Sequence, residues 1–224
     1  PSIADIGSWP WPHDVHARLI DQLAAAKAKT VVHTTLFHEP QLDSGLVYIR
    51  KMKDVLATAG DATPVADDLG KLIAQAELVL DTDAALAASL QAASNVLIPS
   101  EFVLGSPQGK PDVALPAYAL KSAVDDNAGF SILATRLQQP IASIGEAAAG
   151  IGHLNQSPDV DGVVRRVPLL VNYHGKAVPS MALLAAMKGL GLQPADIRPQ
   201  TGESVQLGKL RIRTDASARV LPQF

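Results

Sequence analysis

Cysteine is absent from the 224 residues of the chain. This absence excludes a disulfide framework, thiolate metal ligands and a cysteine nucleophile. It does not fix the compartment, because cysteine-free proteins occur in both oxidising and reducing environments. Aromatic residues are also scarce, at 4%, while apolar residues make up 47% of the chain. Alanine, valine and leucine must therefore fill most of the core.

Strong charge and long apolar runs are missing as well. The chain has 19 basic and 22 acidic residues, a net charge of -3 and no dense basic run. Nucleic-acid-binding proteins normally carry a basic surface, so the composition predicts no nucleic-acid partner. No apolar run approaches the roughly 20 residues that cross a bilayer. The chain opens on PSIADIGSWPWP, without an initiator Met or a basic signal-peptide region. We interpret it as a piece of a longer protein, a reading compatible with membrane spans outside it.

Helical and strand-like patterns alternate along the chain and predict an α/β fold. Val15, Leu19 and Leu23 recur at helical spacing after the proline-rich SWPWP. Later helices carry start signals, with Asp81 or Thr82 before one and Ser180 before another. Helices are expected from about residue 14, within 41–80, after 81 and after 180. Strands are expected at 29–37, 95–105, 150–156 and 163–175, with a hairpin at 204–215.

Two helical patterns occupy residues 41–80. In the first helical pattern, the residues on one side of the helix are Leu46, Ile49, Met52 or Lys53, and Leu56. In the second, one side collects Leu69, Leu72, Ile73 and Ala76. Residues 106–140 are interrupted by prolines and glycines, and the pattern fixes no structure there. The chain has no long linker and no repeat, so we expect one domain over residues 1–224, with a mixed β-sheet flanked by helices.

The stretch SPDVDGVVRR, residues 157–166, combines paired acids with paired arginines. Asp159, Asp161 and Gly162 fit three positions of the EF-hand calcium loop. That register places Pro168 where the loop needs a bidentate glutamate, so the calcium loop is excluded. A catalytic carboxylate pair would need a cleft that the sequence does not reveal. Turn chemistry explains the acids and the glycine more simply.

The remaining polar motifs are individually weak. His13 and His16 are three residues apart, and His33, His38 and Glu39 lie on or after the first strand, a set that could bind a divalent ion. No HExxH motif or second ligand pair accompanies them, so histidines with ordinary partners, at the surface or partly buried, are the favoured explanation. The glycines of GIGHLNQ do not complete a GxGxxG motif, and the chain lacks P-loop and GxSxG motifs.

Tryptophan and arginine supply two further candidates. Trp9 and Trp11 could form an aromatic platform for a ligand or fasten the chain to the core. On a strand, Arg165 and Arg166 would point to opposite faces, leaving one of them for an ion pair or an anionic ligand. The residues alone therefore indicate a soluble α/β domain cut from a longer protein; they leave ligand binding open and support no enzymatic reaction.

Several segments, taken together and in this order, resemble the CHASE domain family, second type. They are SWPWPHDVHARLIDQLAAAKAKTVV, LFHEP, DAALAASLQAASNVLIP, GIGHLNQSPDVDGVVRRVPLLV and VPSMALLAAM. The resemblance runs from about Ile6 to the C-terminus and is weaker over residues 41–80 and 106–145. Its most specific part is WPWP combined with G-x-G-H-x-N-x-x-P-D-x-D-G-x-x-R-R.

The resemblance implies a sensory domain on the outer side of a bacterial cytoplasmic membrane. Such domains sit between membrane spans, perform no catalysis and control a cytoplasmic adenylate or diguanylate cyclase, histidine kinase or protein kinase. The implied partners are an unidentified small-molecule or protein signal, the receptor's own spans and output domain, and a second copy in a homodimer. The resemblance assigns no cofactor, no metal and no ligand-binding residue. Our candidate ligand-binding residues are Trp9, Trp11, His153, Asn155 and Arg165.

The sequence departs from the family pattern in two places. His33-Thr34 stands where members usually have Phe-Asp, and the strand usually preceding WPWP is reduced to SIADIG. Two other functions stay open at this point. One is a stand-alone metal-dependent periplasmic enzyme using Asp159, Asp161 and histidines. The other is a structural domain that only assembles the receptor.

Overall fold

The elements of the fold alternate between helices and short strands. The computed structural model describes residues 7, 9–59, 63–126, 129–200 and 204–222. In chain order the elements are α2 (His13–Ala25), β1 (Val31–Val32), α3 (Ser44–Ala59), α4 (Pro64–Leu80), α5 (Thr82–Ala93), β2 (Val96–Leu104), α6 (Ala117–Leu120), β3 (Val124–Asp125), β4 (Ile132–Gln138), α7 (Ala142–Ala147), β5 (Gly150–His153), β6 (Val167–Pro168), β7 (Leu170–Tyr173), β8 (Lys176–Pro179), α8 (Met181–Gly189), the 3-10 helix η1 (Pro194–Asp196), β9 (Ile197–Gln200), β10 (Ser204–Leu207), β11 (Leu210–Arg213) and β12 (Arg219–Val220).

The main sheet is mixed and is organised around the long strand β2. Its order is β1-β2-β4-β7-β8-β3, with β5 also paired to β2. The first half of β2 pairs in parallel with β1 and with β5, and its second half pairs antiparallel with β4. Strand β4 then pairs in parallel with β7. The predicted fold class, a mixed β-sheet flanked by helices, is confirmed.

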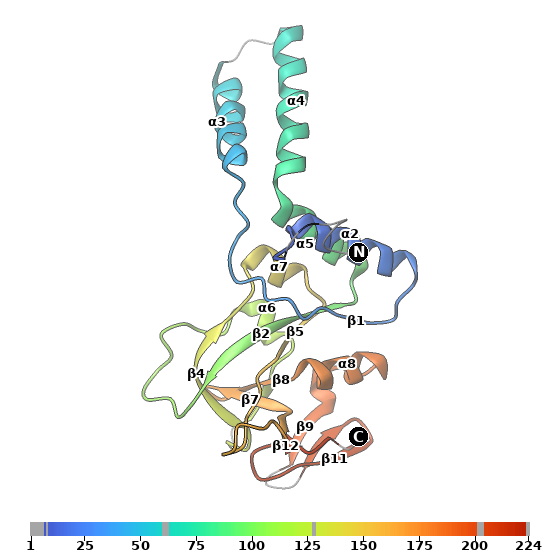
Figure 1. Cartoon of the computed structure of the whole chain (residues 1–224), viewed down its shortest axis with the longest axis vertical. Coiled ribbons are helices and arrows are strands. Elements are labelled where there is room, and N and C mark those ends of the chain that lie inside the picture. Colours follow the sequence, from blue (N-terminus) through green and yellow to red (C-terminus); the bar gives the residue numbers. More distant parts are fainter. Residues whose placement is uncertain (1–6, 8, 60–62, 127–128, 201–203, 223–224) are drawn as a thin grey trace.

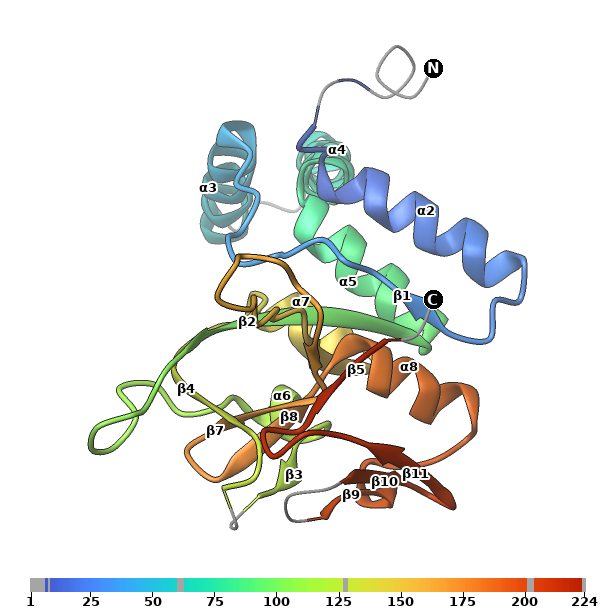
Figure 2. The same ribbon diagram turned by 60° about the horizontal axis from the view of Figure 1, so that its bottom comes forward.

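Helices cover both faces of this sheet because β2 is apolar on both sides. Val96 and Ile98 belong to one core cluster, with residues of α2, α5 and α7, whereas Leu97 belongs to a second cluster, with residues of α8. Figure 2 shows α2 and α5 on one side of β2 and α8 on the other. The cleft described below lies on the α2 side.

Helix starts predicted from the sequence are confirmed. Asp81 caps α5 by accepting a hydrogen bond from the backbone N–H of Ala84 at 3.0 Å. Ser180 caps α8 by accepting one from Leu183 at 3.2 Å. The predicted hairpin is formed by β10 and β11, and β9 adds a third strand.

The predicted first strand is much shorter than expected. Only Val31–Val32 pair with β2, and residues 33–37 continue without a ladder along the edge of the sheet. The predicted strand over 163–175 likewise begins only at Val167. Within the weakly patterned centre, the structure forms α6, β3 and β4. The expectation about a strand upstream of WPWP falls on SIADIG, whose first five residues lie outside the described ones.

The first helix is present, but it buries a different face from the predicted one. Its buried residues are His16, Ala17 and Ile20, whereas Leu19 is exposed. The buried face is displaced by about one residue because a histidine packs there, and an apolar pattern does not count histidine as a core residue.

Helices α3 and α4 form an antiparallel pair that projects from the sheet and its covering helices (Figure 1). We call this pair the arm. Only Asp81 separates the end of α4 from the start of α5, so the arm is joined directly to a helix of the body.

Candidate functional site

An open cleft of about 810 Å³ lies where the N-terminal segment meets the segment that follows β1. Trp9 and Trp11 form part of its wall, His13 and His16 come from the first turn of α2, and residues 34–41 supply the opposite side. Gln138, at the end of β4, completes the lining. Ligand pockets commonly have volumes of roughly 300 to 1,000 Å³. The cleft therefore has the size of a small-molecule site.

The proline-rich start of the chain places the tryptophans beside α2. The Trp9–Pro10 peptide bond is cis, and the indole N–H of Trp11 donates to the carbonyl of Gly7 at 3.0 Å. Pro12 precedes the helix and offers no side-chain cap. Instead Gln41 supplies a distant cap, since its Oε1 accepts the backbone N–H of His13 at 2.7 Å.

Aromatic and imidazole rings form a continuous cluster along the cleft. The Trp9 and Trp11 rings lie 5.6 Å apart, and Trp9 meets the edge of His16 at 5.8 Å. His16 in turn contacts His33 at 5.0 Å and Phe37 at 5.4 Å. Edge-to-face contacts at these separations are the favoured geometry for aromatic rings. The rings therefore form one packed wall.

The paired imidazoles in this wall are held in the neutral form. Nδ1 of His16 lies 3.2 Å from Nε2 of His33, so one nitrogen donates to the other. Burial, with a smaller contribution from the nearby His16, lowers the pKa of His33 to about 4. Burial also lowers the pKa of His16, with a smaller contribution from His13 that Asp14 opposes. Nδ1 of His33 accepts the backbone N–H of Thr35 at 3.2 Å, so both its ring nitrogens are engaged within the protein, and His16 is the member of the pair that lines the cleft.

A second histidine contact ties the cleft to the base of the arm. Nδ1 of His13 lies 2.5 Å from Oδ1 of Asp83, on α5. The Asp83 carboxylate also accepts the backbone N–H of Gln41, with both oxygens at 3.1 Å. Thr82 donates to Oε1 of Gln41 at 2.9 Å. Three separate segments are thereby fixed at one point beside the cleft.

The charges of the lining restrict what the cleft can accept. Glu39 is the one carboxylate among the described lining residues, and none of them is lysine or arginine. Nε2 of His38 is buried and has no hydrogen-bond partner among the described residues. An aromatic wall with one carboxylate suits an uncharged or cationic molecule that carries an apolar part. Nothing in the described lining would neutralise an anion.

Three of the five candidate ligand-binding residues lie outside this cleft. His153 is buried in β5, and burial lowers its pKa to about 3. Asn155 secures the chain after β5, since its Oδ1 accepts the N–H of Phe102 at 3.0 Å and its Nδ2 donates to the carbonyl of the same residue. Arg165 is exposed and paired with Asp159 and Asp161. Trp9 and Trp11 are the two candidates that the structure brings together.

The SPDVDGVVRR stretch forms a turn, as its residue types indicate. The N–H of Gly162 donates to the carbonyl of Asp159 at 2.8 Å, and Gly162 has a φ of 80°. Asp161 accepts the backbone N–H of Val163 at 3.1 Å and binds Arg165 through both oxygens. These contacts, above all the one to Arg165, lower the pKa of Asp161.

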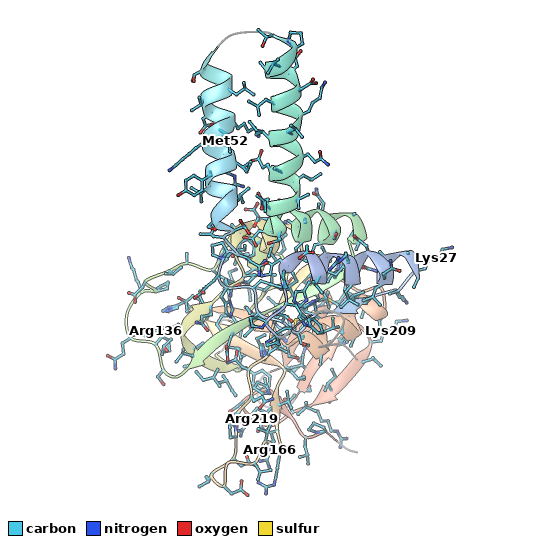
Figure 3. The ribbon with its side chains drawn as sticks, turned by 45° about the horizontal axis from the view of Figure 1, so that its top comes forward. Lys27, Met52, Arg136, Arg166, Lys209 and Arg219 are labelled. Carbon is cyan, nitrogen blue, oxygen red and sulfur yellow. The ribbon has the colours of Figure 1, made fainter. Side chains whose placement is uncertain are left out.

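The two arginines of this stretch do not take opposite sides. Arg165 and Arg166 both reach Asp159, at 3.2 and 3.5 Å, because the strand begins only after them. Arg166 and Arg219 lie close together at this end of the molecule in Figure 3. Among the described residues, no group of three or more histidine or carboxylate side chains is arranged to hold a metal ion.

Sequence reasoning missed most of the cleft. Phe37 and Gln41 were not singled out, and the histidines were expected to have ordinary partners, without the ring contacts being foreseen. The available signal was the repeated occurrence of aromatic and imidazole residues within 9–16 and 33–38. Their meeting depends on long-range packing that no local pattern reveals.

Comparison with known families decides what kind of domain this is. The CHASE2 domain model matches residues 1–224, which is the whole chain. The chain belongs to the CHASE2 family. CHASE2 domains are extracellular sensory domains of cyclase and kinase receptors, and they are sensory instead of catalytic. No curated protein and no solved structure matched the chain. In the described part of this CHASE2 domain, no helix combines the length and apolar character needed to cross a bilayer.

Proposed function

We propose that this CHASE2 domain, over residues 1–224, is the extracytoplasmic ligand-binding module of a bacterial transmembrane receptor. Its partners are the receptor's own membrane spans and a cytoplasmic adenylate or diguanylate cyclase, histidine kinase or protein kinase. The observation that carries the proposal is the cleft in which Trp9, Trp11 and His16 form one wall, with His33 packed behind His16.

The signal is a small uncharged or cationic molecule with an apolar part. The aromatic rings offer it dispersion and cation–π contacts, and the neutral imidazole of His16, which lines the cleft, offers a hydrogen bond through its second ring nitrogen. Glu39 provides the complementary charge for a cation. A ligand in this place contacts residues 34–41. The last of them, Gln41, caps α2 with its side chain and donates its backbone N–H to Asp83 of α5. It can shift a conformational equilibrium by its difference in affinity for the two states.

The experiment uses the fact that the chain has only two tryptophans, and both line the cleft. A library of uncharged, cationic and anionic metabolites is titrated while intrinsic tryptophan emission and the unfolding temperature are recorded. A cleft ligand changes the emission and, at about 100 times its Kd, stabilises the fold by roughly 2.7 kcal/mol.

Variants then locate the binding. We expect Trp11→Ala to raise the Kd of such a ligand by about tenfold or more, because it removes one large ring contact. The Arg165→Ala variant, at the distant turn, leaves the Kd unchanged. Exclusive binding of anions, or a ligand whose affinity falls with Arg165→Ala and not with Trp11→Ala, would refute the proposed cleft.

A further inference from the structure

The arm has an internal contact that uses only one side of each helix. Leu46 of α3 and Ile73 of α4 are buried in this contact, and Ile49 and Leu56 are half-buried. Lys53 donates to Glu77 at 2.6 Å across the same side. These residues define the seam of the arm.

A second apolar stripe on α4 is left uncovered. It consists of Val65, Leu69, Leu72, Ala76 and Val79, spaced by four, three, four and three residues. That spacing is the heptad spacing of a helix–helix contact. Its large members are between 45% exposed, at Leu69, and 77% exposed, at Val65.

Helix α3 carries a matching uncovered stripe. Tyr48, Met52 and Val55 are spaced by four and three residues and are 66%, 46% and 68% exposed. Met52 is labelled in Figure 3 on the part of the arm that stands clear of the body.

Both stripes lie on the same side of the arm. On each helix every stripe residue directly precedes a seam position. On α3, residues 48, 52 and 55 precede the seam positions 49, 53 and 56. On α4, residues 65, 69, 72, 76 and 79 precede the seam positions 66, 70, 73, 77 and 80. One residue corresponds to a rotation of about 100° in a right-handed helix. For two antiparallel helices that face each other, the same rotation before the seam leads to the same side. The arm therefore presents one continuous apolar face made from two helices.

The two stripes also lie at matching heights along the arm. A Cβ added to Gly70 would lie 3.5 Å from Leu56, and one added to Gly45 would lie 3.4 Å from Leu80, which fixes the register of the pair. The residue numbers in these two contacts add up to 126 and 125, so Tyr48 is level with the space between Ala76 and Val79, Met52 with the space between Leu72 and Ala76, and Val55 with the space between Leu69 and Leu72. Each stripe residue of α3 is thus level with a space between two stripe residues of α4.

We propose that the apolar face of the arm binds the same face of a second copy of this chain, forming a four-helix bundle. A two-fold axis along the arm keeps every residue at its own height and places α3 of one copy opposite α4 of the other. Each stripe residue of α3 then meets a space between two stripe residues of α4 of the other copy, which favours interdigitation. Every neighbouring pair of helices in the bundle is antiparallel, the up-down arrangement common in four-helix bundles.

Charge favours the second copy over other occupants. Helix α3 carries Arg50, Lys51 and Lys53 against Asp54, whereas α4 carries Asp67, Asp68 and Glu77 against Lys71. A basic helix therefore meets an acidic one across the dimer as well as within the arm. A membrane surface rich in anionic lipids would attract α3 but repel α4, so the arm lacks the cationic face of an interfacial helix.

The test is sedimentation of the chain over a wide range of concentrations, with two matched variants. Leu72→Lys alters the apolar face, and Leu78→Lys alters a residue of similar exposure on the opposite side of the same helix. We expect the parent chain and Leu78→Lys to dimerise alike. Leu72→Lys should raise the dimer dissociation constant at least about tenfold, because a two-fold axis introduces the charge twice. Far-UV circular dichroism and the unfolding temperature should be unchanged in both variants.

Cross-linking tests the arrangement itself. The chain has no cysteine, so a tagged Tyr48→Cys chain mixed with an untagged Val79→Cys chain should form a mixed disulfide efficiently. Each variant alone should cross-link poorly, since identical helices lie diagonally in the bundle.

Three results would overturn the proposal. They are a parent chain that stays monomeric at every concentration, equal dimerisation of the Leu72→Lys and Leu78→Lys variants, and equal cross-linking of the mixed and single cysteine samples. Binding of the monomeric chain to anionic vesicles that is lost in Leu72→Lys would assign the face to a membrane instead. None of these outcomes changes the tryptophan-emission test of the cleft.

Discussion

A single hydrogen atom at Gly152 lets helix α8 approach strand β5 closely. A methyl group there would lie 2.9 Å from Cδ1 of Leu184, 3.0 Å from Sδ of Met181 and 3.0 Å from the carbonyl oxygen of Pro179. The backbone oxygen cannot move aside as a flexible side chain can. The glycine is therefore required by packing.

The Gly152→Ala variant is predicted to be destabilised by about 1 to 3 kcal/mol, the range for an overpacked core. Urea unfolding measures the change. Gly189→Ala, where nothing lies within 4 Å of the added carbon, is the matched control and should be neutral or slightly stabilised. Equal unfolding midpoints for the two variants would contradict the packing argument.

The identity of a residue alone could not show whether its role is in packing or in a cleft. His153 and Asn155 occur in the family signature beside Gly152, yet one is buried and the other bonds to the backbone of Phe102. Trp9 and Trp11 do lie in a cleft. Ligand contact by Trp9 and Trp11 stays a prediction. The sequence specifies which side chains are present, but the fold determines what surrounds each of them.

For the helices, neighbouring residues in the sequence predicted where a helix begins better than which of its sides is buried. Asp81 and Ser180 were expected as caps and are caps, because a cap depends on neighbouring residues only. The apolar pattern of α4 combined Leu69, Leu72, Ile73 and Ala76, of which Ile73 alone is fully buried. Which part of an apolar face a neighbour covers is set by tertiary packing.

Asp81 makes two stabilising interactions, and matched variants can measure them separately. It caps α5, and its carboxylate binds Arg50 of α3 at 2.5 Å. Asp81→Ala is predicted to cost about 1 kcal/mol, the usual loss for an N-cap. Asp81→Asn keeps the cap, and the loss of one partly exposed ion pair should cost at most a few tenths of a kcal/mol. Thermal unfolding of the two variants measures both terms, and equal losses would show that the cap contributes nothing.

For the whole molecule, buried neutral histidines make stability depend on pH. Burial lowers the pKa of His33 to about 4 and that of His153 to about 3, from an ordinary value of 6.5. Below pH 6.5 the unfolded chain binds protons that the folded chain does not. The free energy of unfolding is therefore greatest above pH 6.5 and falls as the pH drops towards 4.

The predicted loss is up to about 2 kcal/mol for each histidine between roughly pH 7 and pH 5. Urea unfolding at the two pH values measures it. The variant His153→Met removes one of the buried histidines whose pKa is lowered and should lose measurably less stability on acidification than the parent. An unfolding free energy that is constant over this range would contradict the assignment of neutral, buried imidazoles.

The direct junction between α4 and α5 makes the arm a lever. The 17 residues of α4 extend for about 25 Å at roughly 1.5 Å per residue, so a tilt of about 10° at Asp81 displaces the far end by about 4 Å. Both points of attachment, residues 41–43 and 81–83, meet at the hydrogen bonds between Gln41 and Asp83 beside the cleft. A displacement too small to disturb the core would thus be magnified at the tip of the arm.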